Sequence, residues 1–435
     1  MSSDMAFGAE TGGRPAYSRR GLAVAAGAAG NVLEWYDFSV YAFLIPVLSR
    51  AFFPTSEPMT GTLVSLAVLG SGFVMRPLGA VVFSIYGDRA GRRAALTWIM
   101  SLMGLTTFAI GLLPTYHDIG LGAPLALVVL RLIQGLSSGG EWGGAATFVV
   151  EHAQQRRGLY GALHVAGISV GFILGSGTVT ALTGAIGQDA MAAWGWRIPF
   201  LLGISVMLVG LYLRRAVPET PSFEALKAKQ AVSERPLTEA LTQYKSVILT
   251  IFLVSINFAT TTWLTTIYIP TYLITIVHLP PASALQISTI GLLVSTPFLV
   301  LCGWLSDKFG RKPFLIAGST TLIVAALPMF HLMQQGSYVH GLIAQIVLLL
   351  CTGLVTGSYT ALVMELLPTR VRFTGFSTAY NLAQAIFGGF APFAAQYLIA
   401  ATGSSVAPAY LLMAGPIISL GAILMVKETA FEALE

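Results

Sequence analysis

The stretch Gly87-Asp-Arg-Ala-Gly-Arg-Arg93 is a short charged turn between two long apolar runs, and it decides how the chain is organised. It returns as Gly303-Trp-Leu-Ser-Asp-Lys-Phe-Gly-Arg-Lys-Pro313, again between apolar runs and about half the chain length further on. Glycine permits tight backbone turns, and the basic residues favour the cytoplasmic surface of a membrane. A charged turn repeated at half-length predicts two similar halves, each built of membrane helices.

Composition places the chain in a membrane. Of its 435 residues, 55% are hydrophobic and only 10% are charged, whereas a soluble domain is about 25% charged. The net charge of +5 comes from basic residues spread over short loops, which excludes the basic patch of a nucleic-acid-binding protein. Cys302 and Cys351 lie in apolar runs and are interpreted as small core residues rather than a disulfide or a metal site.

Twelve apolar runs are long enough to cross a bilayer, which takes about 20 residues each. They lack polar alternation, so we expect helices rather than barrel strands. We therefore predict an all-α membrane protein with twelve transmembrane helices in two six-helix halves. The predicted segments are a cytoplasmic tail at 1–21, a first half at 22–213, a central cytoplasmic loop at 214–245, a second half at 246–427 and a cytoplasmic tail at 428–435.

Lysine and arginine set the predicted orientation. Almost all of them fall in the two tails and the even-numbered loops, so we expect both termini and these loops to be cytoplasmic. The first 21 residues hold no apolar core with a cleavage site, and we expect no removable signal peptide.

The two halves and their charged turns resemble the major facilitator superfamily. The superfamily pattern Gly-x-x-x-Asp-[Arg/Lys]-x-Gly-Arg-[Arg/Lys] is complete in the second turn, while Ser84 replaces the leading glycine in the first. Four further motifs are similar to the branch of metabolite:proton symporters. They are Asn31-Val-Leu-Glu-Trp-Tyr-Asp-Phe38, Met75-Arg-Pro-Leu-Gly79, Arg131-Leu-Ile-Gln-Gly-Leu-Ser-Ser-Gly-Gly-Glu-Trp-Gly143 and Trp194-Gly-Trp-Arg-Ile-Pro-Phe200.

That branch includes bacterial transporters of citrate, tricarballylate, 2-oxoglutarate, shikimate and proline or betaine. The resemblance therefore implies a multi-pass carrier of the bacterial inner membrane that works as a monomer, but it does not fix the substrate. Ala385-Ile-Phe-Gly-Gly389 is similar to the carboxylate members. Pro408-Ala-Tyr410 and Lys427-Glu-Thr429 are more like the osmolyte members.

Ionisable residues inside the spans are the candidates for function, because they are costly to place there. They fall almost wholly in the first half, and the second half supplies uncharged polar groups, which predicts a site between the halves near mid-membrane. An arginine here either clamps a substrate carboxylate or forms an internal ion pair. The residues predicted to bind substrate are Arg131, Arg76, Gln134, His164, Asn257, Tyr359, Tyr380, Asn381 and Gln384.

Asp37, Glu34 and Glu141 are the candidates for proton coupling, because a carboxylate in a low-dielectric span can load and release a proton near neutral pH. The alternative for each acid is a permanent salt bridge. Sodium could also use the oxygens of Asp37 and Glu141. His164 is either a ligand of substrate or proton or a hydrogen-bonded core residue.

A third set of residues sits at cytoplasmic helix ends, where we predict bonds that keep the inner side closed. This gating set is Asp88, Arg92, Glu151, Asp307, Arg311 and Glu365. The sequence has no phosphate-binding Gly-x-x-x-x-Gly-Lys-[Ser/Thr] loop and no metal-ligand spacing. We therefore expect neither enzymatic activity nor a cofactor or metal, and transport driven by an ion gradient or by the substrate's own gradient.

These observations predict a proton-coupled symporter that imports a small organic acid by alternating access, with a di- or tricarboxylate such as citrate as the first choice. Its expected partners are the organic anion, protons and the lipid bilayer, with no nucleic acid. One alternative is a symporter of the osmolytes proline or betaine, whose single carboxylate needs only one arginine. A non-transporting sensor or a passive channel is the alternative from a different class.

Overall fold

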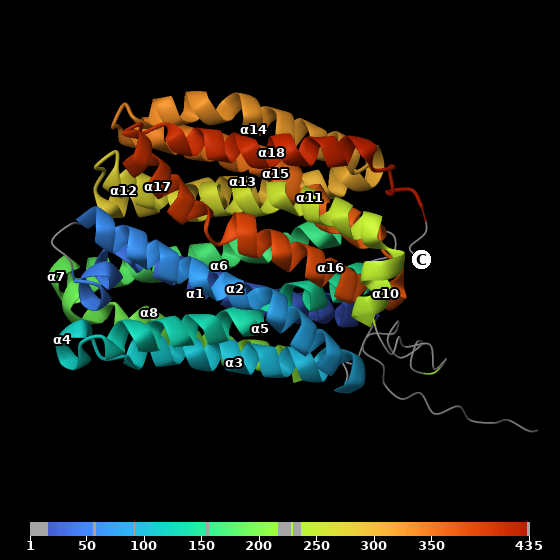
Figure 1. The fold of residues 1–435 in the computed structure, drawn as a ribbon, viewed down its shortest axis with the longest axis horizontal. Helices are drawn as coiled ribbons and strands as arrows, with labels where there is room; N and C mark the ends of the chain where they lie inside the picture. The colour runs from blue at the N-terminus through green and yellow to red at the C-terminus, as the bar shows by residue number, and fades with distance from the viewer. Residues whose placement is uncertain are drawn as a thin grey trace, which may run out of the picture.

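The computed structural model describes residues 16–54, 58–90, 92–152, 156–215, 228 and 236–432, and the statements below refer to these residues. Within them the chain forms helices and no strand. Figure 1 shows the helices running roughly side by side, with α3, α5 and α8 in the lower part of the view and α14, α15 and α18 in the upper part. The gating residues Asp88 and Arg92 have side chains outside the described part.

The N-terminal half holds six long helices joined by short connections. A kink of 64° separates the last long helix from the short helical segments before it. The long helices are α1 (Ala16–Phe52), α2 (Pro58–Ala90), α3 (Arg92–Leu112), α5 (Gly122–His152), α6 (Arg157–Ile186) and α8 (Arg197–Arg215). The short segments are α4 (Tyr116–Ile119), α7 (Gln188–Ala190) and the π-helical η1 (Met191–Gly195).

The C-terminal half repeats this plan, with π-helical turns inside two of its spans. The first span is α11 (Lys245–Thr262), η2 (Trp263–Tyr268) and α12 (Ile269–Thr275), preceded by the short α10 (Pro236–Gln243). The next three are α13 (Pro281–Phe309), α14 (Lys312–Met333) and α15 (Tyr338–Glu365). The last two are α16 (Thr369–Ala383) with η3 (Gln384–Gly388) and α17 (Ala391–Thr402), and α18 (Ala407–Met425).

Eleven helices in the described residues are long and apolar enough to cross a membrane, and a twelfth is counted if the bent pair around Trp196 is one span. The prediction of an all-α membrane protein is thus confirmed. Large apolar side chains such as Trp98, Tyr212 and Met425 are exposed around the bundle, as expected for surfaces that face lipid tails. Most of the predicted central loop lies outside the described residues, and its described end forms α10.

Close helix contacts set the positions of the buried charged residues. A Cβ on Gly79 would lie 1.8 Å from the carbonyl oxygen of Leu136, and one on Gly135 would lie 1.6 Å from that of Gly72. The backbones of α2 and α5 therefore touch, which only glycine permits. This contact brings Arg76 on α2 and Arg131 on α5 into the same buried layer next to α1.

The second charged turn has the geometry that its sequence predicts. Gly310 ends α13 with φ = 97°, a backbone conformation that favours glycine, and its N–H donates to the carbonyl of Ser306. The chain then reverses directly into α14. The turn places Asp307 and Arg311 at one end of the bundle. We call the end that carries Glu151, Asp307 and Glu365 the charged end.

Candidate functional site

Asp37 and Arg131 form the first of two buried ion pairs in the N-terminal half. Nη1 of Arg131 donates to Oδ2 of Asp37 in a short contact and to Oε1 of Gln134 at 2.7 Å. Nε2 of Gln134 donates to Oδ1 of Asp37 at 3.0 Å and to the hydroxyl of Thr107 at 2.9 Å. Arg131 and Asp37 are 1% and 2% exposed. The positive charge of Arg131 is therefore neutralised inside its own half.

The guanidinium of Arg131 nevertheless keeps unused donors. Its Cζ stacks 4.1 Å from the ring centroid of Tyr41, which fixes its plane. Nε and Nη2 have no hydrogen-bond partner although they are buried. Buried donors without partners are rare in folded proteins, so these two nitrogens are available to a ligand.

Glu34 and Arg76 form the second buried pair, one turn before Asp37 on α1. Nη2 of Arg76 donates to Oε1 of Glu34 at 2.5 Å, and Nε of Arg76 donates to Oδ1 of Asn381 at 3.2 Å. Asn381 belongs to α16 in the C-terminal half, so this network crosses between the halves. Oε2 of Glu34 and Nη1 of Arg76 have no partner. Glu141 on α5 and Asp37 on α1 lie close enough to interact electrostatically with Glu34.

An aromatic cluster lies beside this network and also crosses the interface. Trp142 on α5 stacks on Tyr380 of α16 with ring centroids 4.4 Å apart, and Phe258 of α11 stacks on Tyr359 of α15 at the same distance. The ring of His164 packs against Trp142 at 5.0 Å, and neither of its nitrogens has a partner. The hydroxyl of Tyr380 is likewise unpartnered, whereas that of Tyr359 bonds Ser255 at 2.6 Å.

Asn257 and Gln384 stand apart from the charged network. Nδ2 of Asn257 donates to Ser319 at 2.9 Å and its backbone N–H donates to Ser419, so this side chain is held within the C-terminal half. Gln384 accepts from Nε1 of Trp263 at 3.0 Å. The remaining predicted substrate residues lie around the two ion pairs and Trp142. Oδ1 of Asn257 and Nε2 of Gln384 are buried without a hydrogen-bond partner, and a substrate contact of either residue stays a prediction.

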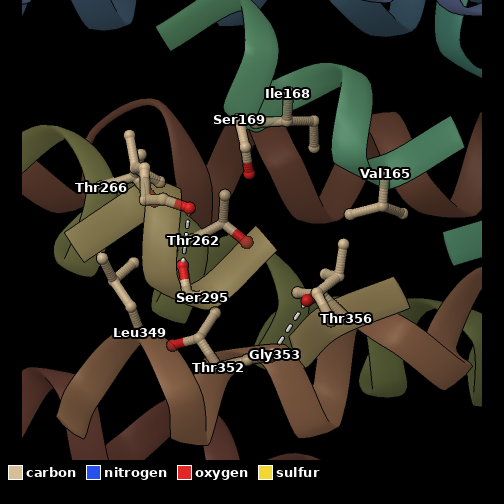
Figure 2. Close-up of a pocket in the computed structure, with 12 residues that line it drawn as sticks. Val165, Ile168, Ser169, Thr262, Thr266, Ser295, Leu349, Thr352, Gly353 and Thr356 are labelled. Atoms are coloured by element: carbon tan, nitrogen blue, oxygen red, sulfur yellow. Dashed lines mark hydrogen bonds between the residues drawn. The ribbon is translucent and has the colours of Figure 1, made fainter. Parts of the chain in front are cut away.

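A small cavity of about 40 Å³ lies between the halves and is lined mostly by hydroxyl and aliphatic side chains (Figure 2). This volume has room for a few water molecules. Its hydroxyl residues come from α6, α11, η2, α13 and α15, and the hydroxyl of Thr262 has no partner. They are Ser169, Thr262, Thr266, Ser295, Thr352 and Thr356. The sequence signal that could have found them is the i,i+4 spacing of threonines in apolar spans.

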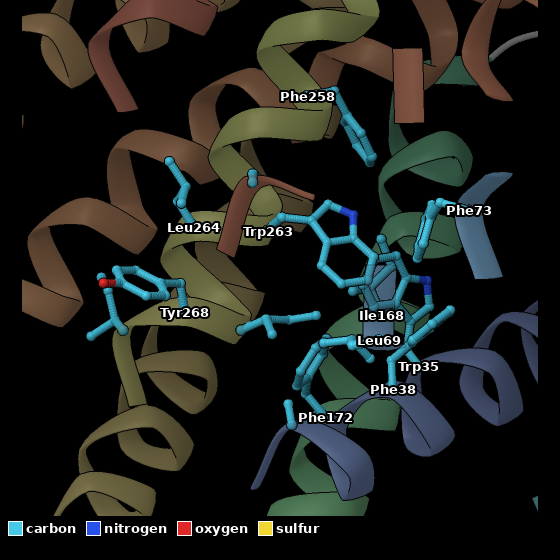
Figure 3. Packing of buried hydrophobic residues seen from close by; sticks show 14 of the residues in the cluster. Trp35, Phe38, Leu69, Phe73, Ile168, Phe172, Phe258, Trp263, Leu264 and Tyr268 are labelled. Carbon is cyan, nitrogen blue, oxygen red and sulfur yellow. The ribbon is translucent and has the colours of Figure 1, made fainter. Parts of the chain in front are cut away.

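Aromatic rings close the interface further from the charged end. Trp263 on η2 contacts Trp35 at 5.6 Å, Phe38 at 5.4 Å and Phe73 at 4.6 Å between ring centroids (Figure 3). Trp263 belongs to the C-terminal half and its three partners to the N-terminal half. The hydroxyls of Ser176 on α6 and Thr289 on α13 also bond across the interface at 2.8 Å.

Two carboxylates close the interface at the charged end through arginines of the opposite half. Glu365, at the end of α15, forms an ion pair with Nε of Arg157 at 3.2 Å and accepts from Nη2 of Arg311 at 3.0 Å. Glu151, at the end of α5, pairs with Nη1 of Arg372 at 3.5 Å. Since α5 and α15 are equivalent spans of the two halves, the two contacts mirror each other.

Asp307 and the segment after α18 add to this closure. The carboxylate of Asp307 accepts from the backbone N–H groups of Gly158 and Leu159 at 2.8 and 2.9 Å, which lie at the start of α6. In the segment after α18, the backbone carbonyls of Ala430 and Glu432 accept from Nη2 of Arg157 at 3.2 and 2.7 Å. Three members of the predicted gating set, Asp307, Arg311 and Glu365, thus belong to one network with Arg157 of the opposite half. Glu151 forms a separate pair with Arg372, and the gating role of these residues stays a prediction.

No group of three or more His, Cys, Asp or Glu side chains in the described residues is arranged to hold a metal ion. The site instead consists of two neutralised arginine–carboxylate pairs, unpartnered polar atoms and an uncharged cavity. The interface is closed by ion pairs at the charged end and by the rings around Trp263 beside the site.

The comparisons with known proteins agree with this arrangement. The family model of the Major Facilitator Superfamily matches residues 27–392. The chain is 37% identical over 431 residues to the glycine betaine/proline/ectoine/pipecolic acid transporter OusA of Dickeya dadantii, which covers 95% of this chain and 84% of that protein. It is 34% identical over 429 residues to a proline/betaine transporter of Escherichia coli, with the same coverage.

Solved structures share the fold at low sequence identity. The proton:xylose symporter XylE bound to 6-bromo-6-deoxy-D-glucose superposes with a TM-score of 0.79 at 18% identity, covering 96% of this chain and 98% of that one. A partially occluded, inward-open XylE of E. coli gives a TM-score of 0.75 at 19% identity, covering 96% and 100%. A multi-pass membrane transporter is the class that the fold and the relatives define. The chain belongs to the Major Facilitator Superfamily.

Proposed function

We propose that this transporter is a proton-coupled symporter of a small zwitterionic osmolyte of the betaine or proline type. The observation that carries the proposal is that both buried arginines of the site are already paired with carboxylates of their own half, Arg131 with Asp37 and Arg76 with Glu34. While both acids are ionised, the site therefore has no surplus positive charge. Protonation of one acid frees one positive charge, which matches the single carboxylate of a zwitterion rather than the two or three of a di- or tricarboxylate. A zwitterion adds no net charge when it enters, which suits a buried site of low dielectric.

The relatives support the same choice. Proteins that share at least a third of this chain's residues over nearly its whole length are named for betaine and proline transport, and citrate does not occur in those names. We therefore favour the osmolyte alternative over the citrate first expected from the buried arginines.

The geometry suggests how proton and substrate would be taken up together. Protonation of Glu34 or Asp37 removes the negative charge that holds its arginine. The released guanidinium can then bind the single carboxylate of the substrate, using the unpartnered nitrogens of Arg131 and Arg76. The aromatic faces around Trp142 attract the cationic group once the halves part. Proton and substrate thus favour each other's binding, which is the requirement for symport.

In alternating access, one of the two closures described above would open while the other stays closed. Opening at the charged end breaks the bonds of Glu365 and Glu151, and opening at the other end separates Trp263 from Trp35, Phe38 and Phe73. We further propose that the charged end is cytoplasmic, in a bacterial inner membrane, because the basic residues of the chain concentrate there.

Uptake by proteoliposomes tests the proposal. We expect labelled betaine or proline to accumulate when the outside is acidic relative to the lumen, and this accumulation to fall when a protonophore removes the gradient. Labelled citrate should stay at background. Citrate uptake driven by the gradient, without betaine or proline uptake, would contradict the proposal.

A further inference from the structure

We propose that Asn381 is the positioning residue that links the proton-binding carboxylate of one half to the closure of the interface with the other half. The inference rests on the proposed proton symport. It concerns a side chain that is fully buried on α16 and that contacts the N-terminal half at two points.

The first contact joins Asn381 to the ion pair itself. Its Oδ1 accepts from Nε of Arg76 at 3.2 Å, while Nη2 of the same guanidinium donates to Glu34 at 2.5 Å. A guanidinium is planar and rigid, so the two bonds fix one orientation together. Rotating Arg76 away from Glu34 would therefore also move Nε away from Asn381.

The second contact joins Asn381 to the backbone of α5. Its Nδ2 donates to the carbonyl of Gly139 at 2.9 Å and to Ser377 of its own helix at 2.8 Å. The neighbouring carbonyl of α5, that of Ser138, accepts from Arg76 at 3.4 Å. Asn381 and Arg76 thus donate to adjacent carbonyls of α5. The bond from Asn381 to Gly139 can form only while α16 lies against α5.

Because α5 and α16 touch closely, separation of the two helices would break the bond from Asn381 to Gly139. A Cβ on Gly143, one turn after Gly139, would lie 1.9 Å from the hydroxyl oxygen of Ser377 on α16. Because buried amides are costly to leave unpaired, loss of the Arg76 bond favours separation of α16 from α5. Protonation of Glu34 would then weaken the interface through Arg76 and Asn381 in turn.

The charged and titratable groups around Asn381 and Arg76 come from four helices. Arg76 on α2 and Asp37 on α1 face Glu34, and Glu141 on α5 adds a like charge. Tyr380, next to Asn381 on α16, faces both Glu34 and Arg76. Asn381 itself has no charge, so its effect on pH dependence must pass through its contacts.

The test separates exchange from gradient-driven accumulation in proteoliposomes supplied with labelled betaine. In Asn381→Ala we expect the ratio of proton-driven accumulation to counterflow of labelled against unlabelled betaine to fall, with accumulation approaching equal concentrations inside and outside. The dependence of exchange on external pH should also flatten. In Asn381→Asp a carboxylate holds Arg76 whether or not Glu34 is protonated, so both counterflow and accumulation should be lost.

Gln345→Ala is the matched control for removal of a buried amide. Gln345 is also fully buried, but its Nε2 donates to the carbonyl of Thr265 within the C-terminal half. We expect its ratio of accumulation to counterflow to equal that of the wild type, even if less protein reaches the membrane.

Three results would decide against the proposal. Wild-type accumulation in Asn381→Ala, with an unchanged pH profile, would show that the residue is not part of coupling. A parallel fall of counterflow and accumulation in that variant would assign it a structural role alone. Wild-type protein that exchanges betaine without responding to a proton gradient would overturn the proposed proton symport, and the inference with it.

Discussion

Replacing Glu365 with glutamine tests whether the charged end holds the two halves together. Oε1 of Glu365 contacts Arg157 at 3.2 Å and Arg311 at 3.0 Å, and Oε2 accepts from Thr429. Of these partners, only Arg157 belongs to the opposite half. Glutamine has nearly the same size, so the substitution removes the charge with little change of shape.

The expected magnitude follows from the one contact of Glu365 that crosses to the opposite half, its ion pair with Arg157. We take this buried ion pair to contribute as much as a hydrogen bond to a charged group, about 1.5–3 kcal/mol, and each 1.4 kcal/mol corresponds to about a tenfold change in an equilibrium. Losing the contact between Arg157 and Glu365 should therefore raise the population that is open at the charged end by roughly 10- to 150-fold. The contact between Arg311 and Asp307 remains, because it lies within one half.

The assay follows the labelling rate of a single cysteine placed in this interface. Ala162 on α6 is fully buried, and a Cβ on Gly303 of α13 would lie 2.3 Å from its Cβ. Ala162→Cys in a background of Cys302→Ala and Cys351→Ala should react with a maleimide only when the halves separate. If opening is fast relative to labelling, the rate is proportional to the open population.

Glu239→Gln is the matched control, and it sets the threshold for refutation. Glu239 pairs with Arg370 at 2.6 Å, but the side chain of Arg370 is 54% exposed and the pair does not join the two halves. An exposed pair is worth about 0–1 kcal/mol, so labelling should rise by less than about fivefold. A Glu365→Gln rate no faster than that of Glu239→Gln would refute the argument, provided that both proteins elute as single species.

Three further predictions concern other parts of the molecule. Trp263→Ala removes the indole ring that closes the interface on the side away from the charged end. A cysteine reagent applied from that side should therefore label Ser176→Cys faster in the presence of Trp263→Ala than in its absence. Thr262→Val removes a buried hydroxyl that has no partner; because nothing is left unpaired, the melting temperature should stay equal or rise, and a fall of several degrees would contradict this. Hydrogen bonds from Thr115 lower the pKa of Asp118, so the cap of α4 should persist above the ordinary titration range of aspartate. It should be lost as the pH falls through the lowered value, and exchange of the Thr115 amide measured against pH checks this.

The fold could be predicted from the sequence because lipid leaves the backbone few choices. The two charged turns and the apolar runs between them specify helices and a two-fold plan, and Gly310 adopts the left-handed conformation that its turn requires. The broken span around Trp196 and the π-helical turns at Trp263 and Gln384 could not be predicted. They depend on packing between helices, and the local residue pattern does not mark them.

The site could be predicted only as a set of residue types. Ionisable residues in apolar spans pointed to Arg131, Asp37, Arg76 and Glu34, but their pairing depends on the close contact of α2 with α5. The cavity hydroxyls were missed because serine and threonine are common in membrane helices, where they bond their own backbone. Asn257 was included because it is polar, although its amide bonds Ser319 within the C-terminal half.

The change in external pH on addition of substrate tests the central claim most directly, because it reports substrate and proton together. In lightly buffered medium, betaine or proline added to vesicles containing the protein should raise the external pH, as protons enter with a zwitterion of no net charge. Citrate should have no effect, and Glu34→Gln should abolish the betaine response if Glu34 carries the proton. Alkalinisation by citrate without any by betaine or proline would contradict the account, since it would require surplus positive charge that the paired arginines do not provide.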